Sequence, residues 1–272
     1  MDLVTLLTER RAELSQRLHL GRAHWDELVT RIGEIEADPT KHCDDEQLWT
    51  CLLACAYASI DRGPSLLAQA LAEGPVSSRC IWFEVLPVSP RENEGQTNLD
   101  LALGDISLRR PTRSGIELSQ TPDPTIVFCE FKWFSDIAGK VSFDEHRNQL
   151  ARVIENALMF RSRDGDFAKV AYVALVTPAV FKERRAPSRL YWYKWHEYAR
   201  DDSTALLTDL EDCCLSPSAG LPSVRDRLSS LRLTWRTYED LVFGAPDSPV
   251  RDAVRQFYEK HAGSLLRSWS VK

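Results

Sequence analysis

The stretch Thr125-Ile126-Val127-Phe128-Cys129-Glu130-Phe131-Lys132-Trp133 decides the fold that the sequence predicts. It is a short run of β-branched and aromatic residues that follows Pro124, which is typical of a buried strand. Two charged residues interrupt the run, although buried strands normally exclude charge. With the two-residue period of a strand, Glu130 and Lys132 point to the same face, about 7 Å apart along the strand.

A buried ion costs several kcal/mol unless it is compensated, so the Glu130 and Lys132 pair needs an explanation. One explanation is a structural ion pair between the two side chains. The other is a third partner that both side chains share, such as a metal ion, a water or a phosphate. Neighbouring positions on one face of a strand suit the shared partner better.

The composition is that of an ordinary globular protein of 272 residues with a net charge of −6. It provides no global basic field, which argues against a nucleic-acid coat protein but not against an enzyme that contacts phosphates locally. Seven cysteines without framework spacing, and no secretory signal at the N-terminus, lead us to expect a reducing, cytoplasmic setting. No apolar run approaches the roughly 20 residues that span a bilayer, so we expect no membrane partner.

Cys51 and Cys55, with His42 and Cys43 nearby, offer residue types that bind zinc. The alternative is that Cys51 and Cys55, one helical turn apart among apolar residues, behave as small hydrophobic side chains. We favour this second interpretation.

The first part of the chain is expected to be helical. Residues 1–42 form a predicted N-terminal helical segment, with two helices interrupted near Gly21. Asp44 and Gln47 resemble an N-cap arrangement for a helix over about 45–60. Glu46 lies in the first turn of that helix, where an acidic side chain is favourable because the helix end is positive.

Strands follow at residues 81–88 and 99–108. Asp100 opens the second strand and shares a face with the small residue Ala102, where a ligand can approach. Asp105, next to Gly104, is expected to be a turn residue. Residues 109–124 hold arginines and prolines and are expected to form a polar hairpin connection.

After the Glu130 strand, a capping box at 142–145 predicts a helix with an apolar stripe from Leu150 to Leu158. Residues 170–178 read as a buried strand, so strand, helix and strand form a parallel crossover and a mixed sheet with helices on its faces. Basic and aromatic residues interleave over 182–198, which suits either base stacking or packing, and packing is the commoner outcome. Residues 201–272 are expected to form a C-terminal helical extension beyond a core at 43–200.

Taken together, Asp100 at the start of one strand, Glu130-Phe131-Lys132 on the next and Gln149 on the following helix resemble the PD-(D/E)XK nuclease superfamily, the restriction-endonuclease-like phosphodiesterases. The resemblance covers about residues 44–178 and includes the order of elements. It implies an α/β fold with a restriction-endonuclease-like core, in which a mixed central sheet flanked by helices follows the order α-β-β-β-α-β.

The resemblance implies a Mg²⁺- or Mn²⁺-dependent nuclease. Asp100 and Glu130 would bind the metal, because Mg²⁺ prefers carboxylate oxygens, and the main-chain carbonyl of Phe131 could add a third oxygen. Lys132 would hold the attacking water, and Gln149 would position the lysine, the water or the phosphate. Glu46 is a further candidate, for a second metal contacted through water.

Two features depart from the family pattern. Leu99 replaces the proline that precedes the aspartate, and Asp100 and Glu130 are about 30 residues apart, which is longer than the compact pattern. Asp105 therefore stays open as an alternative metal ligand.

We expect a nucleic-acid partner, with DNA favoured, and a homodimer if both strands of a duplex are cut. Two rival hypotheses remain. One is a nuclease-like fold that no longer cuts and serves as a binding or scaffold subunit. The other is an unrelated α/β protein whose Glu130 and Lys132 form a purely structural pair.

Overall fold

The computed structural model describes residues 2–20, 22–38, 41, 44–95, 97–140, 147–183, 189–200, 203–262 and 266. Within these residues the chain is an α/β protein whose central sheet has the strand order β1-β2-β3-β6-β7-β8. The sheet strands are β1 (Leu18–His19), β2 (Ile81–Val85), β3 (Leu99–Gly104), β6 (Thr125–Phe131), β7 (Val170–Thr177) and β8 (Leu231–Thr237). A separate hairpin pairs β4 (Ile106–Leu108) with β5 (Ile116–Leu118).

The sheet is mixed. β3 runs antiparallel to both of its neighbours, β2 and β6, whereas β6, β7 and β8 are parallel, and β1 is parallel to β2. The parallel crossover predicted between residues 125–133 and 170–178 is therefore confirmed, with a helix between the two strands.

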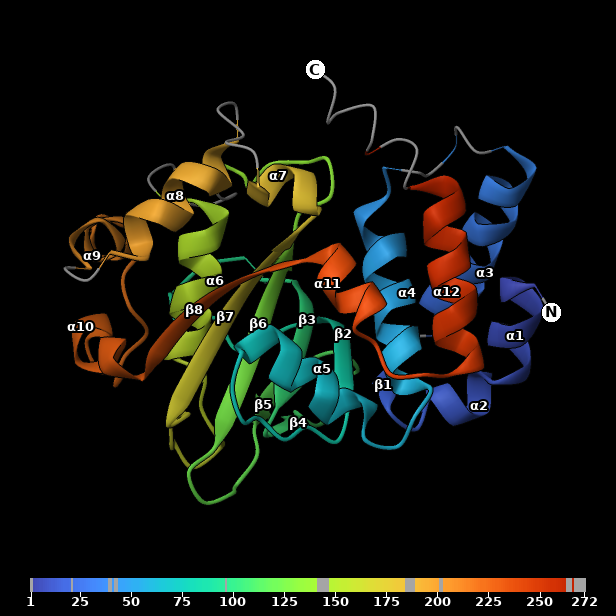
Figure 1. The fold of residues 1–272 in the computed structure, drawn as a ribbon. Helices are drawn as coiled ribbons and strands as arrows, with labels where there is room; N and C mark the ends of the chain where they lie inside the picture. The colour runs from blue at the N-terminus through green and yellow to red at the C-terminus, as the bar shows by residue number, and fades with distance from the viewer. Residues whose placement is uncertain are drawn as a thin grey trace.

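Helices cover both faces of the sheet (Figure 1). Two hydrophobic cores hold the helices on the sheet. The first core contains the helices near both ends of the chain and those between β1 and β2. The second core contains the helices that follow β6 and β7. The first group is α1 (Leu3–Glu9), α2 (Arg11–Leu14), α3 (Arg22–Ala37), α4 (Glu46–Ala58), α5 (Gly63–Ala72), α11 (Tyr238–Phe243) and α12 (Pro249–His261). The second is α6 (Gln149–Leu158), α7 (Ala179–Glu183), α8 (Leu190–Tyr198), α9 (Thr204–Glu211), α10 (Val224–Arg227) and the 3₁₀ turn η1 (Leu228–Ser230).

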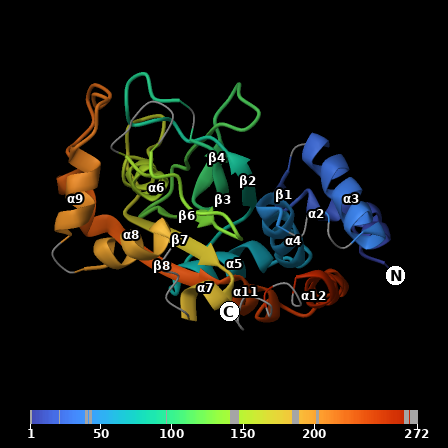
Figure 2. The same cartoon turned by 90° about the horizontal axis from the view of Figure 1, so that it is seen from above.

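Viewed from above, α6, α8 and α9 lie to one side of the sheet and α1, α3, α4 and α12 to the other (Figure 2). The first and last helices of the chain thus share one core, although they are far apart in sequence. The order helix, strand, strand, strand, helix, strand is present as α4, β2, β3, β6, α6 and β7, with α5 and the β4–β5 hairpin added within it.

The prediction of a purely helical C-terminal extension was wrong. Residues 201–272 contain β8 as well as helices, and its residues alternate between apolar and polar types from Leu231 to Trp235 in the two-residue period of a strand. The N-terminal segment is helical as predicted, with three helices, α1, α2 and α3, where two were expected, and it adds β1, which is only two residues long and so gives no periodic signal.

The strand predicted over 99–108 is divided at the turn that the sequence suggested. Gly104 has a φ of 107°, and a Cβ there would lie 2.2 Å from the Thr125 carbonyl oxygen. Glycine is required because it alone tolerates both the positive φ and this close approach. β5, within the predicted connection 109–124, was not expected.

Helix starts differ in detail from the predictions. Asp45 rather than Asp44 caps α4, accepting a hydrogen bond from the Leu48 N–H at 3.1 Å. The capping box at 142–145 lies outside the described residues. α6 begins at Gln149 with Asn148 as its N-cap, and its predicted apolar stripe is buried.

Candidate functional site

The Glu130 and Lys132 side chains meet at the carboxyl end of β6. Lys132 Nζ lies 2.7 Å from Glu130 Oε1, and the two side chains are 5% and 1% exposed. The direct ion pair, which the sequence made the less favoured of the two explanations, is therefore present. Lys132 has a second acidic partner as well, because its Nζ lies 3.0 Å from Glu46 Oε1 on α4.

Asp100 lies beside them on the neighbouring strand. The β3–β6 register pairs Leu101 with Cys129, which brings Asp100 next to the end of β6. Its Oδ2 accepts a hydrogen bond from the Phe131 N–H at 2.7 Å. The main chain at Phe131 therefore faces β3, and Asp100 and Glu130 are brought together as the sequence predicted.

Glu46 contributes more than its placement at a helix end suggested. Besides Lys132, it accepts hydrogen bonds from the Trp133 N–H at 3.0 Å and from Ser135 Oγ at 2.5 Å. The first turn of α4 is thus fixed to the segment that follows β6. Two carboxylates therefore contact the Lys132 ammonium group, and a third, that of Asp100, acts on it electrostatically.

The electrostatics of this cluster show an excess of negative charge. Burial and the neighbouring Glu130 carboxylate raise the pKa of Asp100 well above its usual range, and the nearby Lys132 offsets this only in part. Burial likewise raises the pKa of Glu130 against the opposing effect of Lys132. Burial lowers the pKa of Lys132, but the carboxylates of Glu130, Asp100 and Glu46 outweigh it and raise the pKa overall, so the lysine is a cation.

The residues present suit a hard divalent cation in three respects. Glu130 Oε2 is buried without a hydrogen-bond partner among the described residues, and such an orphaned carboxylate oxygen is costly. The three carboxylates exceed the lysine by two negative charges when all are ionised. Carboxylate oxygens are the ligands that Mg²⁺ and Mn²⁺ prefer.

One observation limits this fit. Within the described residues, no set of three or more His, Cys, Asp or Glu side chains is arranged to hold a metal ion. Asp100 and Glu130 therefore supply two candidate side-chain ligands, and the Phe131 carbonyl is a main-chain candidate. Mg²⁺ is commonly held by one or two carboxylates with waters and substrate oxygens completing the shell.

Gln149 and Asp105 are placed elsewhere. The Gln149 N–H donates to the Ala138 carbonyl at 3.0 Å, and its Oε1 accepts from the Ala138 N–H at 3.2 Å. Gln149 thus holds the loop after Lys132, and its side-chain amide bonds Ala138 rather than the lysine. Asp105 accepts from the Thr125 N–H at 2.8 Å, at the opposite end of β6 from Glu130, so it is a turn residue and Asp100 is the better candidate ligand.

The basic and aromatic stretch 182–198 is largely packing. Tyr191, Trp195 and Tyr198 are buried, and Tyr193 is 38% exposed. Lys182 donates to the Trp235 carbonyl, while Arg184 and Arg185 lie outside the described residues. The aromatic side chains therefore serve mainly to seat α8 on the sheet.

The cysteine pair on α4 is buried as expected for small hydrophobic side chains, with Cys51 3% and Cys55 0% exposed. His42 and Cys43, the other members of the considered zinc set, lie outside the described residues. Among the described residues, no helix is both long and apolar enough to cross a bilayer.

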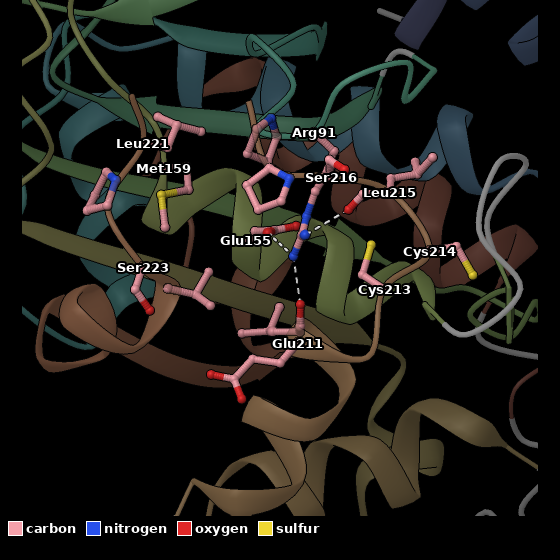
Figure 3. A pocket seen from close by; sticks show the side chains of 15 residues that line it. Arg91, Glu155, Met159, Glu211, Cys213, Cys214, Leu215, Ser216, Leu221 and Ser223 are labelled. Atoms are coloured by element: carbon pink, nitrogen blue, oxygen red, sulfur yellow. Dashed lines mark hydrogen bonds and ion pairs between the residues drawn. The ribbon is translucent and has the colours of Figure 1, made fainter. Parts of the chain in front are cut away.

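A cavity of about 470 Å³ lies away from this cluster, between α6 and the loop around Cys213–Val224 (Figure 3). Its floor holds Arg91, which lies 2.7 Å from Glu155 and donates to the Leu215 and Leu210 carbonyls at 2.9 and 2.7 Å. Arg147, just before α6, is fully buried and pairs with Glu155 and with a second glutamate, Glu94. These charges tie α6 to two loops, and none of the residues lining the cavity belongs to the Glu130 cluster.

One residue near the site, Glu84, was missed from the sequence. Glu84, in β2, has a φ of 49° and falls between the register pairs Phe83–Leu101 and Val85–Leu99, opposite Asp100. It lies 3.2 Å from His24 Nε2 and accepts from Gln47. The signal was available, because Glu84 interrupts an apolar strand as Glu130 does.

Comparison of the chain with known protein families, with curated proteins and with solved structures finds no match.

Proposed function

We propose that this protein is a metal-dependent phosphodiesterase of the PD-(D/E)XK type, with a restriction-endonuclease-like core, that hydrolyses nucleic acid, with DNA as the favoured substrate. One observation carries the proposal: Asp100, Glu130 and Lys132 lie together at a buried strand end, with two carboxylates of raised pKa and one carboxylate oxygen that has no partner among the described residues.

The carboxylates of Asp100 and Glu130 would hold Mg²⁺ or Mn²⁺, and the Phe131 carbonyl is available as a further oxygen. When bound, such a cation would neutralise charge on the phosphate and make a water more acidic. Divalent charge matches the excess of two negative charges in the cluster. It would also lower the cost of ionising Asp100 and Glu130, because an adjacent cation favours the carboxylate form.

Lys132 supplies a fixed cation within the site. It is 5% exposed and held from two sides by Glu130 and Glu46, so its ammonium group is oriented before any substrate arrives. In this position it can donate to a water or to a phosphate oxygen. Preorganised donors of this kind stabilise charge that develops in the transition state.

Glu46 acts as a positioning residue in this account. It joins Lys132 to the main chain at Trp133 and to Ser135, and so holds the start of α4 against the end of β6. The assignment to a second metal made from the resemblance is not needed for the proposal.

The experiment is a cleavage assay on labelled supercoiled plasmid, linear duplex, single-stranded DNA and RNA, with Mg²⁺, Mn²⁺ or a chelator. The parent protein is compared with Lys132→Ala and with the control Lys169→Ala, whose side chain is 61% exposed and pairs with Asp123. We expect metal-dependent cleavage that Lys132→Ala reduces at least about 100-fold and Lys169→Ala leaves intact. Equal cleavage by the parent and Lys132→Ala would reject the proposal.

A second candidate is a nuclease-like fold that binds without cutting. It is favoured by the lack, among the described residues, of three acidic, histidine or cysteine side chains arranged around one metal position. Calorimetric titration separates the two, because the second candidate predicts no Mn²⁺ site that depends on Asp100 and Glu130.

A further inference from the structure

Tyr191, on the first turn of α8, has a buried hydroxyl without a hydrogen-bond partner among the described residues. The residue is 0% exposed. Buried tyrosine hydroxyls usually find a partner, and an unpaired buried polar group destabilises the folded state. A buried hydroxyl that lacks a partner among the described residues is a donor open to a bound ligand.

The main chain fixes Tyr191 beside the segment that follows Lys132. The Leu190 and Tyr191 N–H groups donate to the Asp136 carboxylate at 2.5 and 3.1 Å. Arg189, just before α8, donates to the Phe134 carbonyl at 2.5 Å. The start of α8 and the loop at 134–136 therefore form one unit, a few residues from Lys132.

The ring of Tyr191 is fixed as well. It packs edge-on against Trp235, with 6.0 Å between the ring centroids, and the Trp235 indole donates to Thr177 Oγ1 at 2.9 Å. Thr177 ends β7 next to Val176, the partner of Phe131 in the sheet. Tyr191 therefore lies at the same end of the sheet as Glu130 and Lys132.

The charges around the hydroxyl agree with this location. Burial is the main cause that raises the pKa of Tyr191, and Arg189 opposes it. Asp136 and Glu46 raise the pKa further, whereas Lys132 lowers it, so the hydroxyl is within electrostatic reach of the cluster. It stays protonated at neutral pH and is available as a hydrogen-bond donor.

We propose that Tyr191 is a further ligand-contacting residue of the site, whose hydroxyl donates a hydrogen bond to a phosphate oxygen of the bound phosphodiester. This inference rests on the proposed function. Lys132 is already shared between two carboxylates, and a neutral phenol offers an anionic oxygen a second donor without adding charge to the site. Tyr198 on the same helix provides a contrast, because its hydroxyl is satisfied by Asn148 at 2.6 Å and by Asp209.

The test uses Tyr191→Phe and the matched control Tyr198→Phe in the full-length chain, beside Glu130→Gln. The probe is bis(p-nitrophenyl) phosphate, a small diester that does not depend on the choice between DNA and RNA. Hydrolysis is measured with Mn²⁺, Mn²⁺ affinity is measured by calorimetry, and thermal unfolding is recorded for each variant.

We expect Tyr191→Phe to lower kcat/KM about 10- to 100-fold, the usual effect of removing a hydrogen bond to a charged group. Its Mn²⁺ affinity should stay within about twofold of the parent, and its melting temperature should be equal or higher because an orphaned hydroxyl is removed. Tyr198→Phe should instead melt at a lower temperature and keep its kcat/KM.

The outcomes separate the two proposals. If Glu130→Gln is inactive while Tyr191→Phe hydrolyses the diester within about twofold of the parent, the inference on Tyr191 is overturned and the proposed function stands. Loss of Mn²⁺ binding in Tyr191→Phe would also overturn it, because the hydroxyl would then serve the metal position. Equal behaviour of the parent and Glu130→Gln would reject the proposed function, and the role of Tyr191 with it.

Discussion

Replacing Asp100 by asparagine should stabilise the protein without metal and destabilise it, relative to the parent, with metal. The side-chain oxygen that accepts from the Phe131 N–H at 2.7 Å is retained in asparagine. What is removed is a negative charge whose pKa is raised by burial and by Glu130. Removing a charge that the site penalises should stabilise the folded state by about 1–3 kcal/mol at neutral pH.

The pH dependence has a defined sign. Folding raises the pKa of the Asp100 carboxyl, so ionising this group lowers the free energy of unfolding. This loss of stability is absent below the unfolded pKa of about 3.9 and grows as the pH rises toward the folded pKa. The stability advantage of Asp100→Asn should therefore disappear as the pH falls to about 4.

Metal should reverse the order of stability. A ligand that binds only the folded state at 100 times its Kd adds about 2.7 kcal/mol, and each kcal/mol corresponds to roughly 2–4 °C in a protein of this size. Mn²⁺ should thus raise the melting temperature of the parent by roughly 5–10 °C and leave that of Asp100→Asn nearly unchanged.

The assay is thermal unfolding of the parent, Asp100→Asn and the control Asp105→Asn, each with Mn²⁺ and with a chelator. Asp105 accepts from the Thr125 N–H at the far end of β6, so its variant should respond to Mn²⁺ as the parent does. The reasoning is refuted if Asp100→Asn melts below the parent in chelator, or if Mn²⁺ stabilises both equally.

Three further predictions concern packing and charge. Glu46→Gln should weaken the hold on Lys132 and lower cleavage with little change in Mn²⁺ affinity; a calorimetric loss of the Mn²⁺ site would contradict its positioning role. In Gly104→Ala the new Cβ would lie 2.2 Å from a main-chain oxygen, so the variant should be less stable than the parent by more than about 1 kcal/mol in urea unfolding. An unchanged unfolding midpoint would count against the turn at Gly104. Arg91→Met removes one of the ion-pair partners of the buried Glu155 and should lower the free energy of unfolding by about 3–5 kcal/mol in the same assay. A loss below about 1 kcal/mol would show that the fold does not need this ion pair.

The sequence predicts the central elements because their signals are local. Continuous apolar runs predict β6 and β7, and an apolar stripe predicts α6. Glu130 can be selected as a site residue without knowledge of the fold because a charged side chain is unusual in a buried strand. β8 was overlooked because its two arginines are unusual in a buried strand, although apolar and polar residue types alternate from Leu231 to Trp235. β1 is too short to be recognised at all.

The composition of the site depends on contacts that local patterns do not encode. Glu46 and Lys132 are 86 residues apart, and their contact follows from the way α4 packs over the end of the sheet. Gln149 was expected near the lysine, but it starts α6 and turns its amide to Ala138 instead. From the sequence Tyr191 is only one of the aromatic residues expected to pack over 182–198, and the structure alone reveals that its hydroxyl has no partner among the described residues.

The most direct test of the central claim is nicking of supercoiled plasmid in Mg²⁺ by the parent protein and by Glu130→Gln, with a chelator control. The account predicts nicking by the parent that the chelator abolishes and that Glu130→Gln lacks, while the variant unfolds at a temperature no lower than the parent in chelator. Nicking by Glu130→Gln at the rate of the parent, or a rate that the chelator leaves unchanged, would contradict it.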